Sequence, residues 1–342
     1  MQEYSRYARQ LVLKEIGREG QDCLGRAHVA VIGLGALGSV SANLLARAGV
    51  GRLTLIDRDY LEINNLQRQV LYDEADVADN LPKAVSAKHK LEKINSEIQI
   101  DAEPSDVNAE TIEGLLKGVD LIVDGTDNFE TRFLINDFCL KNKIPWIYGG
   151  AVRTEGMSYV ILPGHGPCLR CLFGEAPGAE NIQTCDQVGI LAPVAHMVAS
   201  FQTIEAIKIL AGHHEAVDRN LWKVDLWNRQ FKSIQLDHLR KNPCSGCGNK
   251  EYPYLNHKAG SRAVALCGRN AVQIYHKTAE RINFKALAKK LGGEGDVSFN
   301  DYLLKYKLSP FEITVFPNGR AIVKGTEDEN QARSLYAKYI GV

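Results

Sequence analysis

Apolar positions along the first 160 residues follow two alternating patterns. Short apolar runs typical of buried strands alternate with longer stretches in which apolar residues recur at helical spacing. Strands are expected near 29–32, 52–56, 98–102, 119–128 and 147, and helices at 4–25, 83–94, 109–116 and 129–141. Strands that alternate with helices in this way indicate a largely parallel sheet. We therefore predict an α/β fold, in which a Rossmann-like mixed β-sheet is flanked by helices.

The pattern changes in the second half of the chain. Residues 163–190 are rich in Gly, Pro and Cys and predict a long loop. A helix is expected at 192–211 and strands at 221–227 and 231–236, and the polar stretch that follows predicts a linker. We divide the chain into a main domain (1–250), a linker (251–261) and a small α+β C-terminal domain (262–342) to which the sequence assigns no role.

Composition narrows the class of protein. The 342 residues are 45% hydrophobic and 24% charged, which is ordinary usage for a soluble globular chain. Lys+Arg and Asp+Glu both number 41, so net charge favours neither nucleic acid nor a membrane as partner. The start of the chain lacks the apolar core of a signal peptide, and we expect a cytoplasmic protein. There, eight cysteines are better explained as metal ligands or reactive thiols than as disulfides.

A glycine motif follows the first apolar run. In VAVIGLGALG, the residues Gly33, Gly35 and Gly38 have G-x-G-x-x-G spacing where a helix is expected to begin. Such a turn lets backbone N–H groups at a helix N-terminus face a phosphate. Asp57 ends the next strand, 19 residues after the last glycine, where a carboxylate can accept both ribose hydroxyls. This pattern predicts a nucleotide-binding unit and fits both NAD and ATP.

The segment after the second strand favours a triphosphate. It holds five polar side chains that we assign to the nucleotide site, namely Asp59, Asn65, Gln67, Arg68 and Lys83. Arg68 and Lys83 can neutralise the β- and γ-phosphates, as a bidentate fork and a point charge respectively. An NAD-dependent oxidoreductase has no use for these two cations. The alternative for Arg68 and Lys83 is that both lie on solvated helix faces. A zinc-stabilised scaffold that binds nucleotide without turnover is a further alternative.

A fourth strand ends in the sequence DGTDN, which places Asp127 and Asn128 at the carboxyl edge of the sheet. Ligands bind at this edge in open α/β sheets. Mg²⁺ is commonly held by one or two carboxylates together with phosphate oxygens. We therefore predict that Asp127 holds Mg²⁺ and that Asn128 belongs to the same site.

Four cysteines form two C-x-x-C pairs, Cys168 with Cys171 and Cys244 with Cys247. Two residues between thiolates suit adjacent corners of a tetrahedron, so two pairs can close one structural Zn²⁺ site. A redox role for each pair is the alternative. Another cysteine, Cys185, precedes the long apolar helix, where its thiolate could be stabilised and act as a nucleophile. A packed or incidental thiol explains Cys185 equally well.

Nine motifs, in one order, resemble a known family. They are RYARQ, GLGALGS, DRDYLEINNLQRQ, LPK, DGTDN, CLRC, TCDQVGILAP, EAIKIL and CSGC. Together they resemble the adenylyltransferases of the MoeB and ThiF groups, which activate ubiquitin-like sulfur-carrier proteins and are related to ubiquitin-activating enzymes. The resemblance implies that the carrier's C-terminal Gly-Gly carboxylate attacks the α-phosphate of ATP, so that an acyl-adenylate forms and pyrophosphate leaves. It implies a molybdopterin-type or thiamine-type pathway, without saying which.

The resemblance also implies roles for individual residues. Asp57 is similar to the family's ribose ligand, Asn65 to a phosphate-side ligand, Arg68 and Lys83 to its triphosphate clamp, and Asp127 to its magnesium-linked acid.

Two further roles involve other molecules. Arg9 resembles an arginine that reaches the ATP of the neighbouring subunit, which implies a homodimer with shared active sites. Cys185 matches a cysteine that some members join to the carrier as a thioester or acyl-disulfide, and sulfur would come from a separate donor. After about residue 250 the chain is expected to depart from the family's pattern.

Overall fold

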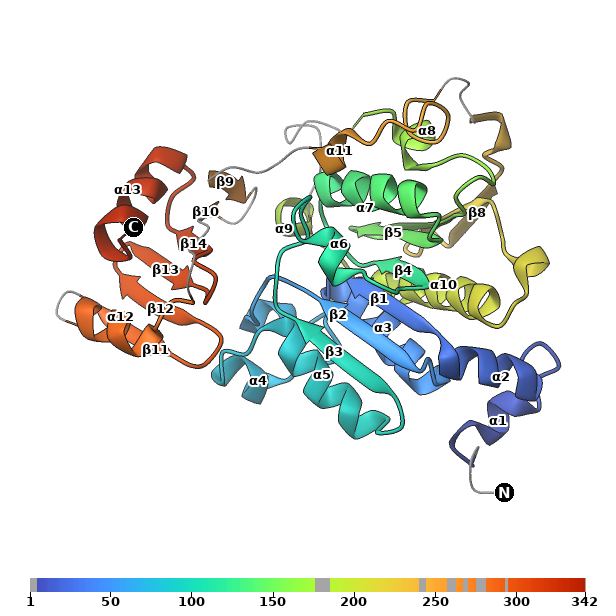
Figure 1. Cartoon of the computed structure of the whole chain (residues 1–342), viewed down its shortest axis with the longest axis horizontal. Coiled ribbons are helices and arrows are strands. Elements are labelled where there is room, and N and C mark those ends of the chain that lie inside the picture. Colours follow the sequence, from blue (N-terminus) through green and yellow to red (C-terminus); the bar gives the residue numbers. More distant parts are fainter. Residues whose placement is uncertain are drawn as a thin grey trace. The chain divides into compact units, whose positions relative to one another are not determined.

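The structure is a computed structural model and describes residues 5–175, 185–239, 244–256, 263–266, 270–274, 281–292 and 295–341. It divides into two compact units, Met1–Lys258 and Ala259–Val342 (Figure 1). Each unit has its own sheet and its own hydrophobic core. The functional division of the chain at residues 251–261 stays a prediction.

The first unit contains an eight-stranded mixed sheet with the order β3-β2-β1-β4-β5-β6-β7-β8. Its strands are β1 (His28–Ile32), β2 (Arg52–Ile56), β3 (Gln99–Glu103), β4 (Leu121–Asp124), β5 (Trp146–Val152), β6 (Glu155–Ile161), β7 (Leu221–Asp225) and β8 (Gln230–Ile234). The strands from β3 to β5 in this order pair in parallel, and the remaining three pair antiparallel. The predicted Rossmann-like mixed sheet is confirmed.

Helices cover both faces of this sheet, as Figure 1 shows. One core contains apolar residues of α3 (Ala36–Ala48), α5 (Lys83–Ile94) and α10 (Ala192–Leu210). The second core contains those of α6 (Ile112–Leu115) and α7 (Phe129–Asn142). Because both faces are covered, β1 and β4 are buried along their whole length, which explains why they read as continuous apolar runs.

Several local elements differ from the expectation. The expected N-terminal helix is divided into η1 (Ser5–Tyr7), α1 (Ala8–Leu11) and α2 (Gly17–Arg26). The predicted loop at 163–190 contains α8 (Leu169–Phe173) and α9 (Cys185–Val188), and the predicted linker opens with α11 (Pro253–Asn256). Short elements after β2, before β7 and after β8 were not predicted, namely η2 (Ile63–Asn65), α4 (Glu74–Ala78), η4 (His214–Ala216) and η5 (Asp237–Leu239). Each has at most five residues, too few to show a helical apolar period.

The second unit is a six-stranded antiparallel sheet with the order β11-β12-β13-β14-β10-β9. Its elements are β9 (Ala263–Leu266), β10 (Ala271–Ile274), α12 (Phe284–Leu291), β11 (Asp296–Phe299), β12 (Leu304–Leu308), β13 (Phe311–Val315), β14 (Ala321–Lys324) and α13 (Glu329–Tyr339). Apolar residues of α12 and α13 join those of the strands in one core. The expected small α+β unit is confirmed.

Within the described part of the chain, no helix combines the length and the apolar character that crossing a membrane requires.

Candidate nucleotide site and metal centre

The glycine motif forms a close backbone contact between two loops at the carboxyl edge of the sheet. Gly33 has φ +84°, and a Cβ atom there would lie 2.7 Å from the carbonyl carbon of Gly125, in the loop after β4. A Cβ atom at Gly38 would overlap the carbonyl oxygen of Gly33. These two positions therefore require glycine, and they bring the N-terminus of α3 against the loop that precedes Asp127.

Asp57, directly after β2, is tied to this glycine loop. Its Oδ2 accepts the backbone N–H of Leu34 at 2.6 Å, and its Oδ1 accepts that of Asp59 at 2.7 Å. Burial raises the pKa of Asp57 above its ordinary value, the Lys83 ammonium opposes this shift, and the Asp59 carboxylate adds to it. The predicted ribose ligand thus lies beside the phosphate-facing turn, as a nucleotide requires.

Lys83 is a buried cation at the same edge. Only 6% of the residue is exposed. Its Nζ lies 3.5 Å from Asp59 Oδ2, and its backbone N–H donates to the Asp59 carbonyl at 2.9 Å. Tyr72 donates its hydroxyl to the Leu34 carbonyl at 2.9 Å, which joins the segment before α5 to the glycine loop. A buried ammonium with one long ion pair can bind an anionic ligand at little additional desolvation cost.

The LQRQ segment follows η2. Asn65 is buried, and its side-chain oxygen accepts the N–H of Glu62 at 3.2 Å. Arg68 donates Nη1 to the Asn64 carbonyl at 2.8 Å, whereas Gln67 is exposed. The assignment of Asn65, Gln67 and Arg68 to the nucleotide stays a prediction.

Gln69 is a candidate that the sequence reasoning missed. Only 3% of this residue is exposed, and its buried Oε1 has no hydrogen-bond partner. Its Nε2 lies 3.8 Å from the place where a Cβ of Gly35 would be. A buried amide that faces the nucleotide loop has unused hydrogen-bonding capacity at the predicted phosphate site. Its position in the QRQ sequence was a signal, but polar spacing alone does not reveal burial.

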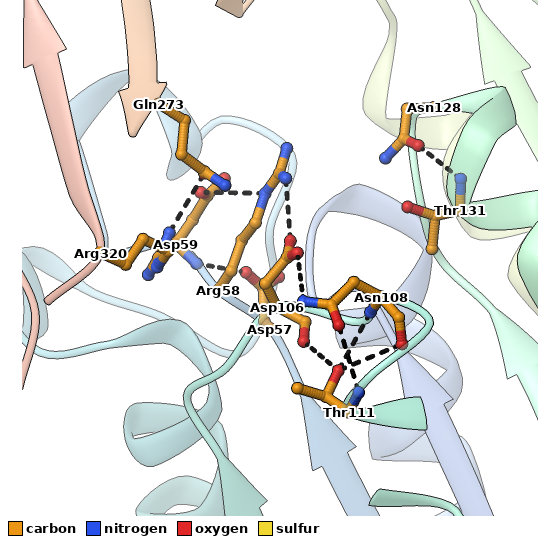
Figure 2. A network of polar contacts seen from close by, with 10 residues as sticks. All are labelled: Asp57, Arg58, Asp59, Asp106, Asn108, Thr111, Asn128, Thr131, Gln273 and Arg320. Atoms are coloured by element: carbon orange, nitrogen blue, oxygen red, sulfur yellow. Dashed lines mark hydrogen bonds and ion pairs between the residues drawn. The ribbon is translucent and has the colours of Figure 1, made fainter. Parts of the chain in front are cut away.

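The loop after β4 carries Asp127 and Asn128. Asn128 caps α7 and accepts the backbone N–H of Thr131 at 2.8 Å (Figure 2). Asp127 is exposed at the edge of the sheet, where an oxygen ligand for Mg²⁺ is accessible. The side chain of Asn128 is used by the helix cap, so its predicted contact with nucleotide stays untested.

A second polar network flanks Asp57 on the side of β3, as Figure 2 shows. Arg58 donates to Asp106 at 2.9 Å, and its Nε lies 4.0 Å from Asp59. Thr111 donates its hydroxyl to the Asp106 carbonyl at 2.8 Å and fixes this loop. The sequence reasoning assigned no role to Arg58 or Asp106, because their pairing depends on the parallel contact of β2 with β3.

The four cysteines form one buried cluster. Their Sγ atoms all lie within 4.8 Å of one another. The separations are 3.9 Å for Cys168–Cys171, 3.8 Å for Cys168–Cys244 and 3.6 Å for Cys171–Cys247. A tetrahedral Zn²⁺ with bonds of about 2.3 Å requires sulfur atoms about 3.8 Å apart, whereas a disulfide requires about 2 Å. The cluster therefore fits the predicted structural zinc and contradicts a disulfide within either pair.

The chemistry of the thiols supports the same conclusion. Burial and the neighbouring thiols together raise the pKa of the Cys247 thiol to about 11. The pKa of Cys168 is also raised, by its contact with Cys171 and by burial. Four thiolates can coexist at this place only with a cation that offsets their charge.

A buried ion pair connects the cluster to α7. Arg170 donates Nη2 to Asp137 at 3.2 Å, and Asp137 accepts the N–H of Tyr254 at 3.1 Å. The rings of Phe133 and Tyr254 lie 5.3 Å apart. The start of the predicted linker is therefore packed on α7 as α11, a contact that its polar sequence did not indicate.

Two predicted site residues lie elsewhere. Arg9 is exposed on α1. Its neighbour Gln10 donates to the Ala48 carbonyl at 2.9 Å, and Tyr7 accepts from Asn95 at 2.8 Å. Those partners precede β2 and β3, so α1 lies at the amino edge of the sheet, opposite the glycine loop.

Cys185 opens α9, but its side chain lies outside what the structure describes. Its role as a nucleophile stays a prediction.

Comparison with known proteins identifies close relatives. The sulfur carrier protein ThiS adenylyltransferase of Bacillus subtilis (strain 168) is 41% identical over 339 residues, which cover 98% of this chain and 99% of the relative. The SAMP-activating enzyme E1 of Haloferax volcanii is 36% identical over a match that covers 71% of this chain and 88% of the relative. The first of these similarities continues through the C-terminal unit, so this relative shares the part of the chain that was expected to depart from the family's pattern.

Solved structures share the fold over most of the chain. The crystal structure of E. coli MccB with ATP superposes with a TM-score of 0.61 and 26% identity, covering 71% of this chain and 74% of that one. The ThiF family model matches residues 7–247, which is more than half of the chain. The glycine loop, the buried Lys83 and the four-cysteine cluster all lie within the matched range, and the chain belongs to the ThiF family.

Proposed function

We propose that this protein uses ATP to adenylylate the C-terminal Gly-Gly carboxylate of a small ubiquitin-like sulfur-carrier protein. A carboxylate oxygen of the carrier bonds to the α-phosphorus of ATP, the bond from that phosphorus to the bridging oxygen breaks, and pyrophosphate leaves with the electron pair. The acyl-adenylate that remains prepares the carrier for thiocarboxylation.

The observation that carries this proposal is the buried Lys83 beside Asp57 at the glycine loop. Asp57 accepts the ribose hydroxyls, the N-terminus of α3 faces a phosphate, and Lys83 stabilises the negative charge that moves onto pyrophosphate. Arg68 supplies the second cation of the clamp. An NAD-dependent oxidoreductase leaves Lys83 and Arg68 unused, and the ThiF family match favours the adenylyltransferase.

We assign Mg²⁺ to Asp127. The exposed carboxylate at the carboxyl edge fits a cation that keeps several waters and binds phosphate oxygens. When bound, Mg²⁺ neutralises charge on the triphosphate. Asp127 orients the ion relative to the glycine loop, which the Gly33–Gly125 contact places next to it.

We further propose a homodimer in which Arg9 of one subunit completes the site of the other. Arg9 lies at the amino edge of its own sheet, so a strand length of roughly 17 Å separates it from its own glycine loop. Val12 and Leu13, close to it in sequence, are 74% and 51% exposed. Apolar side chains beside a cation that cannot reach its own site support a contact with a second subunit.

The carrier that we favour is of the thiamine-pathway ThiS type, with the molybdopterin-pathway type as the second candidate. The support is the B. subtilis relative, which matches the C-terminal unit as well as the first. We expect Cys185 to receive the acyl group as a thioester or to form an acyl-disulfide, with sulfur from a separate donor. We place the reaction in the cytoplasm, and we assign the four cysteines to one structural Zn²⁺ per subunit.

The test is adenylate formation on purified carriers. The protein is incubated with ATP and either a ThiS-type or a molybdopterin-type carrier, and the adduct is read by mass spectrometry. We expect an AMP adduct on the ThiS-type carrier, and none on the same carrier without its final glycine. Tight ATP binding with no adduct on any Gly-Gly-ending carrier from the same cell would favour the non-catalytic scaffold instead.

A further inference from the structure

Arg132, in the first turns of α7, anchors the loop after β4. Only 6% of Arg132 is exposed. Its Nε donates to Asp124 Oδ2 at 3.0 Å, and its Nη2 donates to the carbonyl oxygens of Thr126 at 2.6 Å and Gly149 at 2.8 Å. One planar group therefore joins the end of β4, the loop after it and β5.

Asp124 is the other half of this anchor and is fully buried. Its Oδ1 accepts both the backbone N–H of Thr126 at 2.9 Å and the Thr126 hydroxyl at 2.6 Å. From α10, Gln202 donates Nε2 to the Asp124 carbonyl at 2.7 Å. Both carboxylate oxygens of Asp124 are thus used to fix the first half of the loop.

The second half of the loop is fixed by the cap of α7. Asn128 accepts the N–H of Thr131 at 2.8 Å, as Figure 2 shows. Asp127 stands between the two fixed points with its own side chain exposed. The Asp127 carboxylate also interacts electrostatically with the Arg132 guanidinium, and the two anchors together restrict where that carboxylate can be.

We infer that Arg132 is a positioning residue for adenylation, which holds the 125–128 loop so that the Asp127 carboxylate meets the magnesium ion that accompanies ATP. The inference rests on the metal role proposed for Asp127. Arg132 itself is enclosed by Asp124, Thr126 and Gly149 and acts through the loop. Lysine cannot replace it, because an ammonium lacks the planar fork that serves these three acceptors together.

Arg170 offers a matched control in the same fold. It is 5% exposed and pairs with the fully buried Asp137 at 3.2 Å. It lies over the ring of Phe133 at 5.6 Å, much as Arg132 lies over that of Tyr148 at 4.9 Å. This second pair is reached about one and a half turns further along α7, on the side of the zinc cysteines. Loss of either pair should destabilise the protein, but only one pair fixes the loop of Asp127.

The experiment compares Arg132→Lys, Arg170→Lys and Asp127→Asn in the full-length protein with carrier and ATP. The Mg²⁺ concentration that gives half-maximal adenylation is measured for each variant, with kcat and the thermal midpoint. We expect Arg132→Lys to lower kcat at least about tenfold and to raise the Mg²⁺ requirement, as Asp127→Asn does, because a misplaced group at a reacting centre loses rate steeply. Arg170→Lys should lower the thermal midpoint and keep the wild-type Mg²⁺ requirement.

The outcomes separate the inference from the proposal on which it rests. An unchanged Mg²⁺ requirement in Arg132→Lys, together with a raised one in Asp127→Asn, would overturn the positioning role alone. An unchanged requirement in Asp127→Asn would overturn the metal role of Asp127 and the inference with it, while adduct formation by the wild type would still stand. Should Arg132→Lys fail to fold, Thr126→Val tests the same loop, because it removes the hydroxyl that Asp124 accepts, and the same shift in Mg²⁺ requirement is expected.

Discussion

The carboxyl edge of the eight-stranded sheet and the four-cysteine cluster are both built from segments far apart in sequence, yet they differ in whether they leave a position for a ligand. The cluster closes on itself, because four sulfur atoms at mutual distances that suit one tetrahedral ion leave no position for a substrate. The edge, in contrast, keeps buried polar groups that a ligand can use. Lys83 is buried with a partner at 3.5 Å, and Gln69 keeps an unpartnered buried oxygen. The comparison supports our proposal that the first region is structural and that the second binds a ligand.

The largest effect, a loss of stability, should come from removing one ligand of the four-cysteine cluster. We expect Cys171→Ser to lose the zinc and to unfold at a much lower temperature, because structural zinc contributes about 10 kcal/mol or more of folding free energy in small domains. Metal analysis and thermal unfolding measure this. Cys23→Ser is the control, because Cys23 is half-buried outside the cluster and should change stability by only about 0.5 kcal/mol. A wild-type protein that holds no zinc with all four thiols reduced would contradict the assignment.

The next largest effect, on the adenylation rate, should come from the proposed nucleotide site at the carboxyl edge. Removal of the buried cation in Lys83→Ala should lower the adenylation rate at least about 10²-fold, by analogy with the loss of one transition-state donor. Lys88→Ala, on the same helix, removes only an exposed ion pair with Glu92 at 3.7 Å and should leave the rate unchanged. Equal rates for the two variants would show that Lys83 is a structural residue and not part of the triphosphate clamp.

A smaller effect tests whether Arg9 of a second subunit contributes to the proposed nucleotide site. Arg9→Ala and Lys83→Ala subunits are each expected to be inactive alone. When they are mixed in equal amounts, half of the dimers should be mixed and each should hold one intact site, so about one quarter of wild-type activity should return if the dimer is symmetric. No recovery in dimers shown to have exchanged subunits would argue that Arg9 serves no shared site.

The smallest expected effect is on the pH dependence of ATP binding. In our proposal the carboxylate form of Asp57 accepts the ribose hydroxyls, so ATP affinity should fall as pH decreases through the pKa of Asp57, which burial places above its ordinary value. The charge of Asp59 also raises that pKa, so Asp59→Asn should move the acid limb of ATP binding to lower pH. Titration calorimetry across pH measures the shift, with the exposed Glu92→Gln as control. A limb that moves to higher pH would contradict this electrostatic account.

The sequence predicted the sheet better than it predicted the contacts between loops. β2 and α5 begin and end at the predicted residues because their apolar positions are consecutive or helically spaced. The two C-x-x-C pairs predicted their cluster because ligand spacing is local within each pair. Motif spacing likewise identified Asp57 and Lys83, whose surroundings in the structure fit a nucleotide.

Other features depend on which segments meet in three dimensions. Arg132 appears in the sequence as an ordinary cation on a helix, and only the fold brings it to Asp124 and Gly149. Gln69 gives no sign of burial, because it lies in a polar segment after Gln67 and Arg68. The polar stretch after residue 250 hides a helix that packs through Tyr254. The spacing of residues within one segment cannot predict these contacts, because they join segments that are far apart in the sequence.

Carrier-dependent exchange of labelled pyrophosphate into ATP is the most direct measurement of the proposed chemistry. If the edge binds a triphosphate beside a carboxylate, label should enter ATP only when a Gly-Gly-ending carrier is present, and Lys83→Ala should abolish the exchange. Absence of exchange with every such carrier of the cell, together with binding of NAD at the glycine loop, would contradict the account.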